Sequence, residues 1–350
     1  MRFDVAILGA TGAVGQRFIE LLQNHPWFKI EVLAASERSA GKKYREACRW
    51  ILKTPMPKDI GEMTVVNTDV KSVSREANVD LVFSALPGGI AGPIEEEFAE
   101  SYPVVSKARA HRYDEDVPLI IAEVNPDHLR LIPIQKERRH TEGFITTDPN
   151  CSTIQLALSL KPLEKYGISE VIVSTMQALS GAGYPGVPSL DILDNVIPYI
   201  SGEEEKVEIE PLKILGEFDG EKINYASFKV SASCNRVNVS DGHLESVFVK
   251  LEENPSIEEI IETFENFRGE VKDLNLPSAP EKPIVVRKEQ DRPQPKYDRD
   301  ESNGMSVVLG RIRSDPIMTV KYMCLGHNTV RGAAGAGILT AELLAAKNYL

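Results

Sequence analysis

Residues 3–15 have the sequence FDVAILGATGAVG, in which a mostly apolar run is followed by glycines at positions 9, 12 and 15. The run predicts a buried β-strand over residues 3–8, and apolar residues at positions 14, 18, 21 and 22 predict a helix directly after it. Glycines between a strand and a helix let the backbone approach a pyrophosphate, while the N-terminus of the helix faces its negative charge. The stretch therefore predicts a dinucleotide-binding loop whose contacts come from Gly9, Thr11, Gly12, Ala13 and Val14.

Strand and helix patterns alternate through the rest of the first 148 residues. Short apolar runs that predict strands lie at 31–35, 65–66, 80–84 and 104–106. Because alternating strands and helices imply crossover connections, we expect the α/β fold class, with a Rossmann-type doubly wound parallel sheet.

The pattern changes near Pro149. Strands are predicted in succession at 169–177, 225–233, 236–240, 243–251, 305–313 and 318–325, which favours a mixed or antiparallel sheet. The stretch 277–300 is rich in proline and charge and predicts an exposed excursion, whereas the alanine- and leucine-rich residues from Thr329 predict a terminal helix. We expect a dinucleotide-binding domain over residues 1–148, completed by a C-terminal helix at 328–350, and an α+β catalytic and oligomerisation domain over 149–327.

Length and charge exclude several classes of protein. The chain has 350 residues, more than one ordinary core holds, so two domains are the default. Its formal net charge of −12 argues against nucleic acid or an anionic membrane as a partner. No long apolar run predicts a transmembrane helix, and the N-terminus lacks the pattern of a signal peptide. The cysteines are far apart, so neither a metal site nor a disulfide framework is expected, and a reducing cytoplasm fits best.

The residues after the second strand bear on which dinucleotide binds. An NAD enzyme usually has an acidic residue here that bonds the ribose 2′-hydroxyl. Residues 35–43 are ASERSAGKK, and Ser36, Arg38 and Ser39 could hold a 2′-phosphate by charge-assisted hydrogen bonds. Glu37 could instead face the ribose, but the neighbouring arginine favours NADP.

Residues 148–153, DPNCST, place Cys151 at the start of an amphipathic helix. The helix dipole and its free N–H groups favour a thiolate there, and a thiolate attacks acyl carbons well. The remaining cysteines lie in apolar contexts that are typical of packing residues. Among six histidines, spacing alone leaves both His243 and His327 as candidates for the acid or base.

Taken together, several motifs resemble the aspartate-semialdehyde dehydrogenase family, particularly its archaeal and fungal branch. The resemblance covers essentially the whole chain and rests on the segments 9–15 (GATGAVG), 34–42 (AASERSAGK), 149–153 (PNCST), 177–183 (QALSGAG), 234–237 (CNRV), 241–245 (DGHLE) and 328–335 (NTVRGAAG). It implies Cys151 as the nucleophile, His243 as the general acid and base, and Gln177 as the residue that positions the acyl group.

The resemblance also implies how the substrate and cofactor are held. Arg236 would grip the substrate carboxylate, Glu210 the amine, and Lys213 and Arg112 the phosphate, with Asn150 beside the nucleophile. Further cofactor contacts would come from Ser84, Leu86, Ser180, Gly181 and Asn328. One departure stands out: residues 106–109 are SKAR, where many relatives have Ser-Asn followed by small residues, so Lys107 and Arg109 add two charges near the expected phosphate region.

The implied reaction is the NADPH-dependent reductive dephosphorylation of L-aspartyl-4-phosphate to L-aspartate 4-semialdehyde through a cysteine thioester, without a metal. Small-molecule substrates, phosphate and a homodimer or homotetramer are the expected partners. The alternative is a malonyl-CoA reductase of the same fold, which segments 181–191 and 327–332 suit equally well, although the context of Cys151 resembles the aspartate branch. A non-catalytic nucleotide sensor is a further alternative that the four site residues Cys151, Gln177, Arg236 and His243 disfavour.

Overall fold

Six parallel strands form the first sheet, in the order β3-β2-β1-β4-β5-β6. The computed structural model describes residues 2–350. The strands are β1 (Phe3–Leu8), β2 (Phe28–Ala35), β3 (Val66–Asn67), β4 (Leu81–Ser84), β5 (Pro103–Ser106) and β6 (Phe144–Thr147). The order reverses direction at β1, as in doubly wound sheets that bind ligands at the carboxyl ends of their strands. The α/β Rossmann-type fold class is therefore confirmed.

Helices cover both faces of this sheet. They are α1 (Ala13–Leu22), α2 (Tyr44–Ala47), α3 (Lys58–Glu62), α4 (Val70–Glu76), α5 (Gly88–Ala99) and α6 (Leu131–Arg139). Apolar residues of α1 and of the C-terminal helix α12 (Gly335–Ala346) pack on one face, and those of α4 and α5 pack on the other. Because side chains alternate along a strand, neighbouring residues such as Val5 and Ala6 enter different cores.

The second sheet is mixed, with the strand order β10-β7-β11-β14-β13-β12. Its strands are β7 (Ile168–Gln177), β10 (Lys229–Arg236), β11 (His243–Leu251), β12 (Ile284–Arg287), β13 (Val307–Ser314) and β14 (Val320–Gly326). Its core is shared with α7 (Cys151–Leu160), α9 (Glu203–Ile214) and α10 (Ile257–Asn266). On the other face Ile172 is 47% exposed, so this face of β7 is not covered within the chain.

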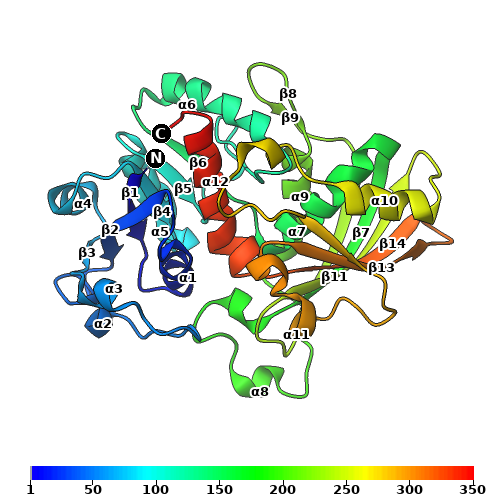
Figure 1. The fold of residues 1–350 in the computed structure, drawn as a ribbon, viewed down its shortest axis with the longest axis horizontal. Coiled ribbons are helices and arrows are strands. Elements are labelled where there is room, and N and C mark those ends of the chain that lie inside the picture. The colour runs from blue at the N-terminus through cyan, green and yellow to red at the C-terminus, as the bar shows by residue number, and fades with distance from the viewer. Residues whose placement is uncertain (1) are drawn as a thin grey trace.

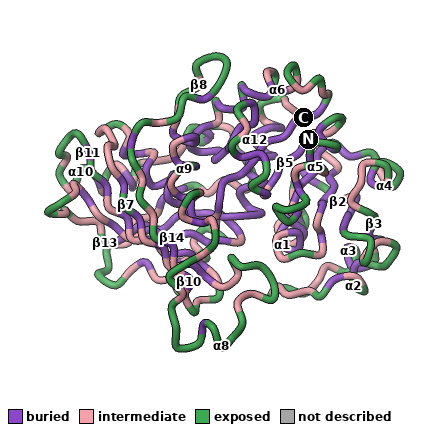
Figure 2. The backbone as a smooth tube through the Cα atoms, turned by 180° about the vertical axis from the view of Figure 1, so that it is seen from behind, coloured by how far each residue is buried: buried purple, intermediate pink, exposed green. Residues whose placement is uncertain are grey.

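The smaller elements lie at the edges of this domain. They are α8 (Ser189–Ile192), the hairpin of β8 (Glu217–Phe218) and β9 (Ile223–Asn224), and α11 (Pro295–Asp298). The loop that carries α8 extends from the body of the molecule and is largely exposed (Figures 1 and 2). Within residues 2–350, no helix combines the length and the apolar character needed to cross a membrane.

The terminal helix joins the two halves. In Figure 1, α12 runs between the two sheets, and it is buried along almost its whole length (Figure 2). Just before it, Arg331 donates two hydrogen bonds of 2.7 Å to the carboxylate of Glu123, 208 residues away, and both side chains are buried. A buried, bidentate pair of this kind fixes the terminal segment against the first domain.

Two predictions of local structure were wrong. Residues 237–240 form no strand, because Val239 N–H bonds the carbonyl of Val237 in a tight turn and the segment then pairs with Leu179 and Ser180. The expected excursion at 277–300 contains β12, a short edge strand that pairs parallel with β13. An edge strand tolerates nearby prolines and charges because only one of its sides needs partners.

Candidate active site

Cys151 is the first residue of α7, as the sequence predicts. Asn150 caps the helix, and its side-chain oxygen accepts hydrogen bonds from the N–H groups of Ser152 and Thr153. A methyl group on Gly332 would lie 2.7 Å from the β-carbon of Cys151, so only glycine lets the terminal segment pass this close. The thiol is thereby fixed at the junction of the two domains.

The structure distinguishes between the two candidate histidines. Nε2 of His243 lies 3.2 Å from Sγ of Cys151, whereas Nε2 of His327 lies 3.7 Å from the carboxylate of Asp300. The N–H of Ala178 donates to Nδ1 of His243 at 3.0 Å. In the neutral imidazole, Nδ1 is then the acceptor and the proton is on Nε2, facing the sulfur.

Burial dominates the electrostatics of this pair. It raises the pKa of the Cys151 thiol to about 12, and the charge of Glu203 raises it further, against the opposing charges of Lys206, Arg112 and Arg236. Burial also lowers the pKa of His243 to about 3. The two side chains therefore rest as neutral thiol and neutral imidazole, whereas the helix dipole alone had favoured a thiolate.

Glu203 organises the residues around the thiol, although the sequence did not single it out. It is 5% exposed and begins α9. Its Oε1 accepts hydrogen bonds from Gln177 at 2.9 Å and Asn150 at 2.8 Å, and its other oxygen pairs with Lys206. One buried carboxylate thus positions two of the predicted site residues.

Arg236 approaches the catalytic pair from the second sheet. Its guanidinium donates to the carbonyl of Ala178 at 2.7 Å. A methyl group on Gly181 would lie 2.9 Å from Nη1 of Arg236 and 3.2 Å from Nε2 of His243. The backbone of Gly181 therefore lies directly over both side chains, where any other residue would displace them.

Glu210, Arg112 and Lys213 form a second buried group beside Asn150. Glu210 accepts from Arg112 at 2.8 Å and from the backbone N–H of Asn150 at 2.7 Å. Lys213 donates at 2.8 Å to the carbonyls of Arg112, Asp114 and Val117. In this conformation the three protons of Lys213 are all engaged, so its predicted phosphate contact requires it to leave one of these carbonyls.

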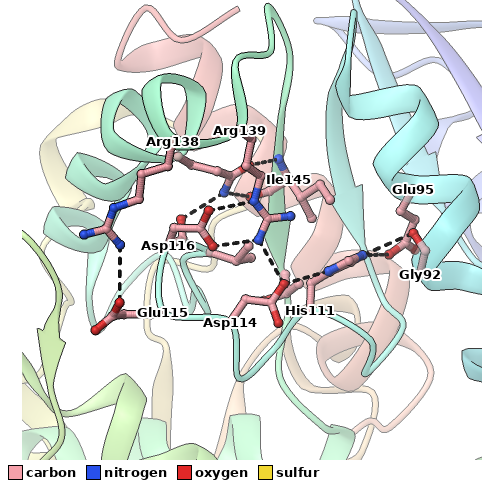
Figure 3. A network of polar contacts seen from close by, with 12 residues as sticks. Gly92, Glu95, His111, Asp114, Glu115, Asp116, Arg138, Arg139 and Ile145 are labelled. Carbon is pink, nitrogen blue, oxygen red and sulfur yellow. Dashed lines mark hydrogen bonds and ion pairs between the residues drawn. The ribbon is translucent and has the colours of Figure 1, made fainter.

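An ion-pair network holds the segment that carries Arg112 (Figure 3). In the figure, Asp114 lies between His111 and Arg139, with contacts of 2.8 and 2.9 Å. These two partners lower the pKa of Asp114 to about 2. His111 also faces Glu95 on α5, so the segment is fixed to the first domain from two directions.

The glycine loop fits a dinucleotide. Gly9 has φ +74°, and a methyl group there would lie 2.6 Å from the carbonyl of Ala85, while one on Gly15 would lie 2.4 Å from the carbonyl of Gly9. Gly12, the N-cap of α1, has no side chain that could cap the first N–H groups of the helix, which leaves them for a phosphate. A cavity of about 550 Å³ extends from Ala13 on this helix to Ser180 and Thr329.

The other predicted cofactor residues occupy different positions around this loop. Ser36 and Arg38 are exposed just beyond β2, with Ser39 next to them. Asn328 donates to Oγ of Ser180 at 2.8 Å and accepts from the N–H of Gly242, which joins two walls of the cavity.

Two predicted cofactor contacts are buried in the first domain. Ser84 is fully buried and donates to Glu95 at 2.5 Å, so its hydroxyl faces the interior. Leu86 is 8% exposed next to Gly9. The backbone of residues 84–86, rather than these two side chains, borders the loop.

Comparisons with known proteins agree with this architecture. Residues 4–132 match the model of the semialdehyde dehydrogenase NAD binding domain, and residues 160–331 match that of the semialdehyde dehydrogenase dimerisation domain. The chain is 57% identical to the aspartate-semialdehyde dehydrogenase of Archaeoglobus fulgidus, over 98% of each chain. The chain belongs to the aspartate-semialdehyde dehydrogenase family.

Two further relatives help to define its place in the family. The crystal structure of aspartate semialdehyde dehydrogenase with NADP from Candida albicans is 41% identical, with a TM-score of 0.91 and full coverage of both chains. The chain is also 43% identical to the malonyl CoA reductase (NADP) of Metallosphaera sedula, over 99% of this chain and 97% of that one. The aspartate-semialdehyde dehydrogenase resemblance predicted from the motifs is confirmed.

Proposed function

We propose that this member of the aspartate-semialdehyde dehydrogenase family reduces L-aspartyl-4-phosphate to L-aspartate 4-semialdehyde, with release of phosphate, in the biosynthesis of aspartate-derived amino acids. The observation that carries the proposal is the contact of 3.2 Å between Sγ of Cys151 and Nε2 of His243 at the start of a helix. A cysteine and a histidine in this arrangement suit acyl transfer, and the buried guanidinium of Arg236 beside them suits a substrate carboxylate.

The chain's own residues perform the acyl chemistry. The sulfur of Cys151 attacks the acyl carbon, the bond to the phosphate oxygen breaks, and a thioester forms, while the thiol proton leaves with the phosphate. Nε2–H of His243 donates a proton to the oxygen of the thiohemiacetal that reduction leaves. The same nitrogen takes the proton back as the C–S bond breaks, so that the aldehyde leaves and the thiolate is regenerated. Gln177, held by Glu203, orients the acyl group.

NADPH would be held by the glycine loop and the start of α1, with Ser36, Arg38 and Ser39 at its 2′-phosphate and Asn328 near the nicotinamide end. When bound, it supplies the hydride that reduces the thioester. The cavity supports this placement, because it is lined by Ala13 at the start of α1 and by Ser180, whose neighbour Gly181 lies over His243. The Candida albicans relative was crystallised with NADP, which supports the choice of NADP over NAD.

Glu210 and Asn150 would border the substrate amine, and Arg112 the phosphate, with Lys213 a predicted second phosphate ligand. The molecule would act as a homodimer or homotetramer through the uncovered face around Ile172, which lies within the matched dimerisation domain. Free cysteines among the described residues fit a reducing compartment, and we place the protein in the cytoplasm.

The second candidate function is malonyl-CoA reduction, which the Metallosphaera sedula relative favours. Both candidates use the same thiol, so the assay must distinguish the leaving group. Reduction of NADP and of NAD is measured with L-aspartate semialdehyde plus phosphate, and in parallel with malonate semialdehyde plus CoA. Phosphate-dependent turnover that Cys151→Ala abolishes supports the proposal. CoA-dependent turnover of the malonate aldehyde alone would replace it with the second candidate.

A further inference from the structure

Lys107 lies at the point where the first sheet meets the active site. It directly follows β5, and Asp148 directly follows the neighbouring strand β6. The carboxyl ends of parallel strands form the ligand-binding edge of such a sheet. The side chain of Lys107 is 8% exposed, and its ammonium lies 3.3 Å from Oδ2 of Asp148.

This ammonium has spare hydrogen-bonding capacity. Among residues 2–350, Nζ of Lys107 has no acceptor with hydrogen-bond geometry, and the same holds for Nε of Arg112. Arg112 lies close to this residue, since its guanidinium donates to the backbone carbonyl of Lys107 at 2.9 Å and its charge acts on the Lys107 ammonium. A buried ammonium without a hydrogen-bond acceptor, beside a guanidinium Nε–H that also lacks one, is costly unless a ligand completes both.

The nearby charges show which ligand fits. Burial lowers the pKa of Lys107; Asp148 opposes this shift, Arg112 reinforces it, and Cys151 is close enough to oppose it. Lys107 and Arg112 are thus two cations close to each other and to the nucleophile, where an anion would relieve their repulsion. Arg236, from the second sheet, remains for a carboxylate at the other end of the substrate.

We propose that Lys107, together with Arg112, binds the phosphoryl group of the acyl phosphate and the attacking phosphate of the reverse reaction, in place of Lys213. This inference rests on the proposed function. Lys213 already donates to three carbonyls, whereas Nζ of Lys107 has no acceptor and is free to donate to a phosphate oxygen. Asp148 positions the ammonium, and Asp148 itself is held by Thr340 of α12 at 2.8 Å.

The test is steady-state kinetics of the full-length enzyme in the phosphorylating direction, with L-aspartate semialdehyde, NADP and inorganic phosphate. Loss of a charge-assisted hydrogen bond in Lys107→Met should raise the KM for phosphate by about 10- to 100-fold. The KM for the aldehyde should change less than about twofold, because Arg236 and not Lys107 faces that carboxylate. Lys107→Arg should recover part of the phosphate affinity.

Two other variants are measured in parallel. Lys71→Met, at an exposed position on α4 of the first domain, controls for loss of one positive charge. Lys213→Met tests the rival ligand, and the proposal requires its rise in the KM for phosphate to be smaller than that of Lys107→Met. Binding of inorganic phosphate to Lys107→Met is also followed by thermal shift, which needs no turnover.

Three results would overturn the assignment: an unchanged KM for phosphate in Lys107→Met, an equal rise for both substrates, or a larger effect at Lys213. A wild-type enzyme that turns over the aldehyde only with CoA would instead refute the proposed function, and the Lys107 assignment with it.

Discussion

Replacing Glu203 by glutamine should lower the pKa of the catalytic thiol. Oε1 of Glu203 lies 2.8 Å from Nδ2 of Asn150, and Cys151 is the next residue along the chain. With about 3.8 Å between consecutive α-carbons, the carboxylate lies on the order of 7 Å from the sulfur. At an effective dielectric constant of about 20, two unit charges at this distance repel by about 2.4 kcal/mol, or about 1.7 pKa units.

In Glu203→Gln the pKa of the Cys151 thiol should therefore fall by about 1–2 units from about 12, the value to which burial and Glu203 together raise it. A lower pKa increases the thiolate fraction at neutral pH but makes each thiolate less nucleophilic. The net alkylation rate at pH 8 should rise by about 3- to 15-fold. Glutamine loses the ion pair with Lys206 but keeps the oxygen that accepts from Gln177 and Asn150, so the positions of these two side chains should persist.

The assay is the pH dependence of iodoacetamide modification, followed by mass spectrometry on the peptide that contains Cys151. Glu205→Gln is the matched control, because Glu205 is exposed on the same helical turn. The variant profile should move to lower pH while the control follows the wild type. A profile for Glu203→Gln that is unchanged, or that moves to higher pH, would show that the charge of Glu203 does not raise the pKa of the thiol.

Three further predictions concern stability and geometry. Arg331→Met leaves the buried carboxylate of Glu123 without its partner and should lower the free energy of unfolding by about 3–5 kcal/mol; denaturant titration checks this, and a loss under about 1 kcal/mol would contradict it. Gly181→Ala should lower kcat/KM by about 10- to 100-fold at an unchanged melting temperature, because the methyl group displaces the catalytic histidine. A kcat/KM equal to that of the wild type in steady-state kinetics would show that the site accommodates the methyl group without displacing His243. His111 and Arg139 lower the pKa of Asp114 to about 2 in the folded protein. The contribution of Asp114 to the stability of the fold is therefore complete above about pH 4, near the pKa of an aspartate in the unfolded chain, and is lost as the pH falls toward about 2. The urea midpoint of Asp114→Asn should therefore fall less than that of the wild type as the pH is lowered from about 4 to about 2. An equal fall in both proteins would show that Asp114 does not cause the acid sensitivity.

Local signals predicted the parts of the fold that depend on neighbours in sequence. The strand, the glycines and the helix over residues 3–22 are contiguous, and the turn between them admits little besides glycine at position 9. The position of Cys151 was equally local, because Asn150 is a strong helix cap. These features needed no knowledge of tertiary contacts.

Features that depend on packing could not be predicted in the same way. His243 and His327 both follow glycines, and only the antiparallel pairing of β11 with β7 and β14 places one of them at the thiol. Glu203 belongs to a charged stretch that resembles a solvated helix, and it is buried because α9 packs on the start of α7. Lys107 was recognised only as a departure from the family, because burial of its ammonium arises from the meeting of two strand ends.

Covalent catalysis by Cys151 can be tested by trapping the acyl group on its sulfur. The enzyme is mixed with L-aspartate semialdehyde and NADP in the absence of phosphate, quenched with acid, and digested for mass spectrometry. We predict an aspartyl thioester on the peptide that contains Cys151, formed with a matching burst of NADPH and discharged when phosphate is added. Absence of the adduct despite normal turnover, or an equal burst in Cys151→Ala, would contradict covalent catalysis by this cysteine.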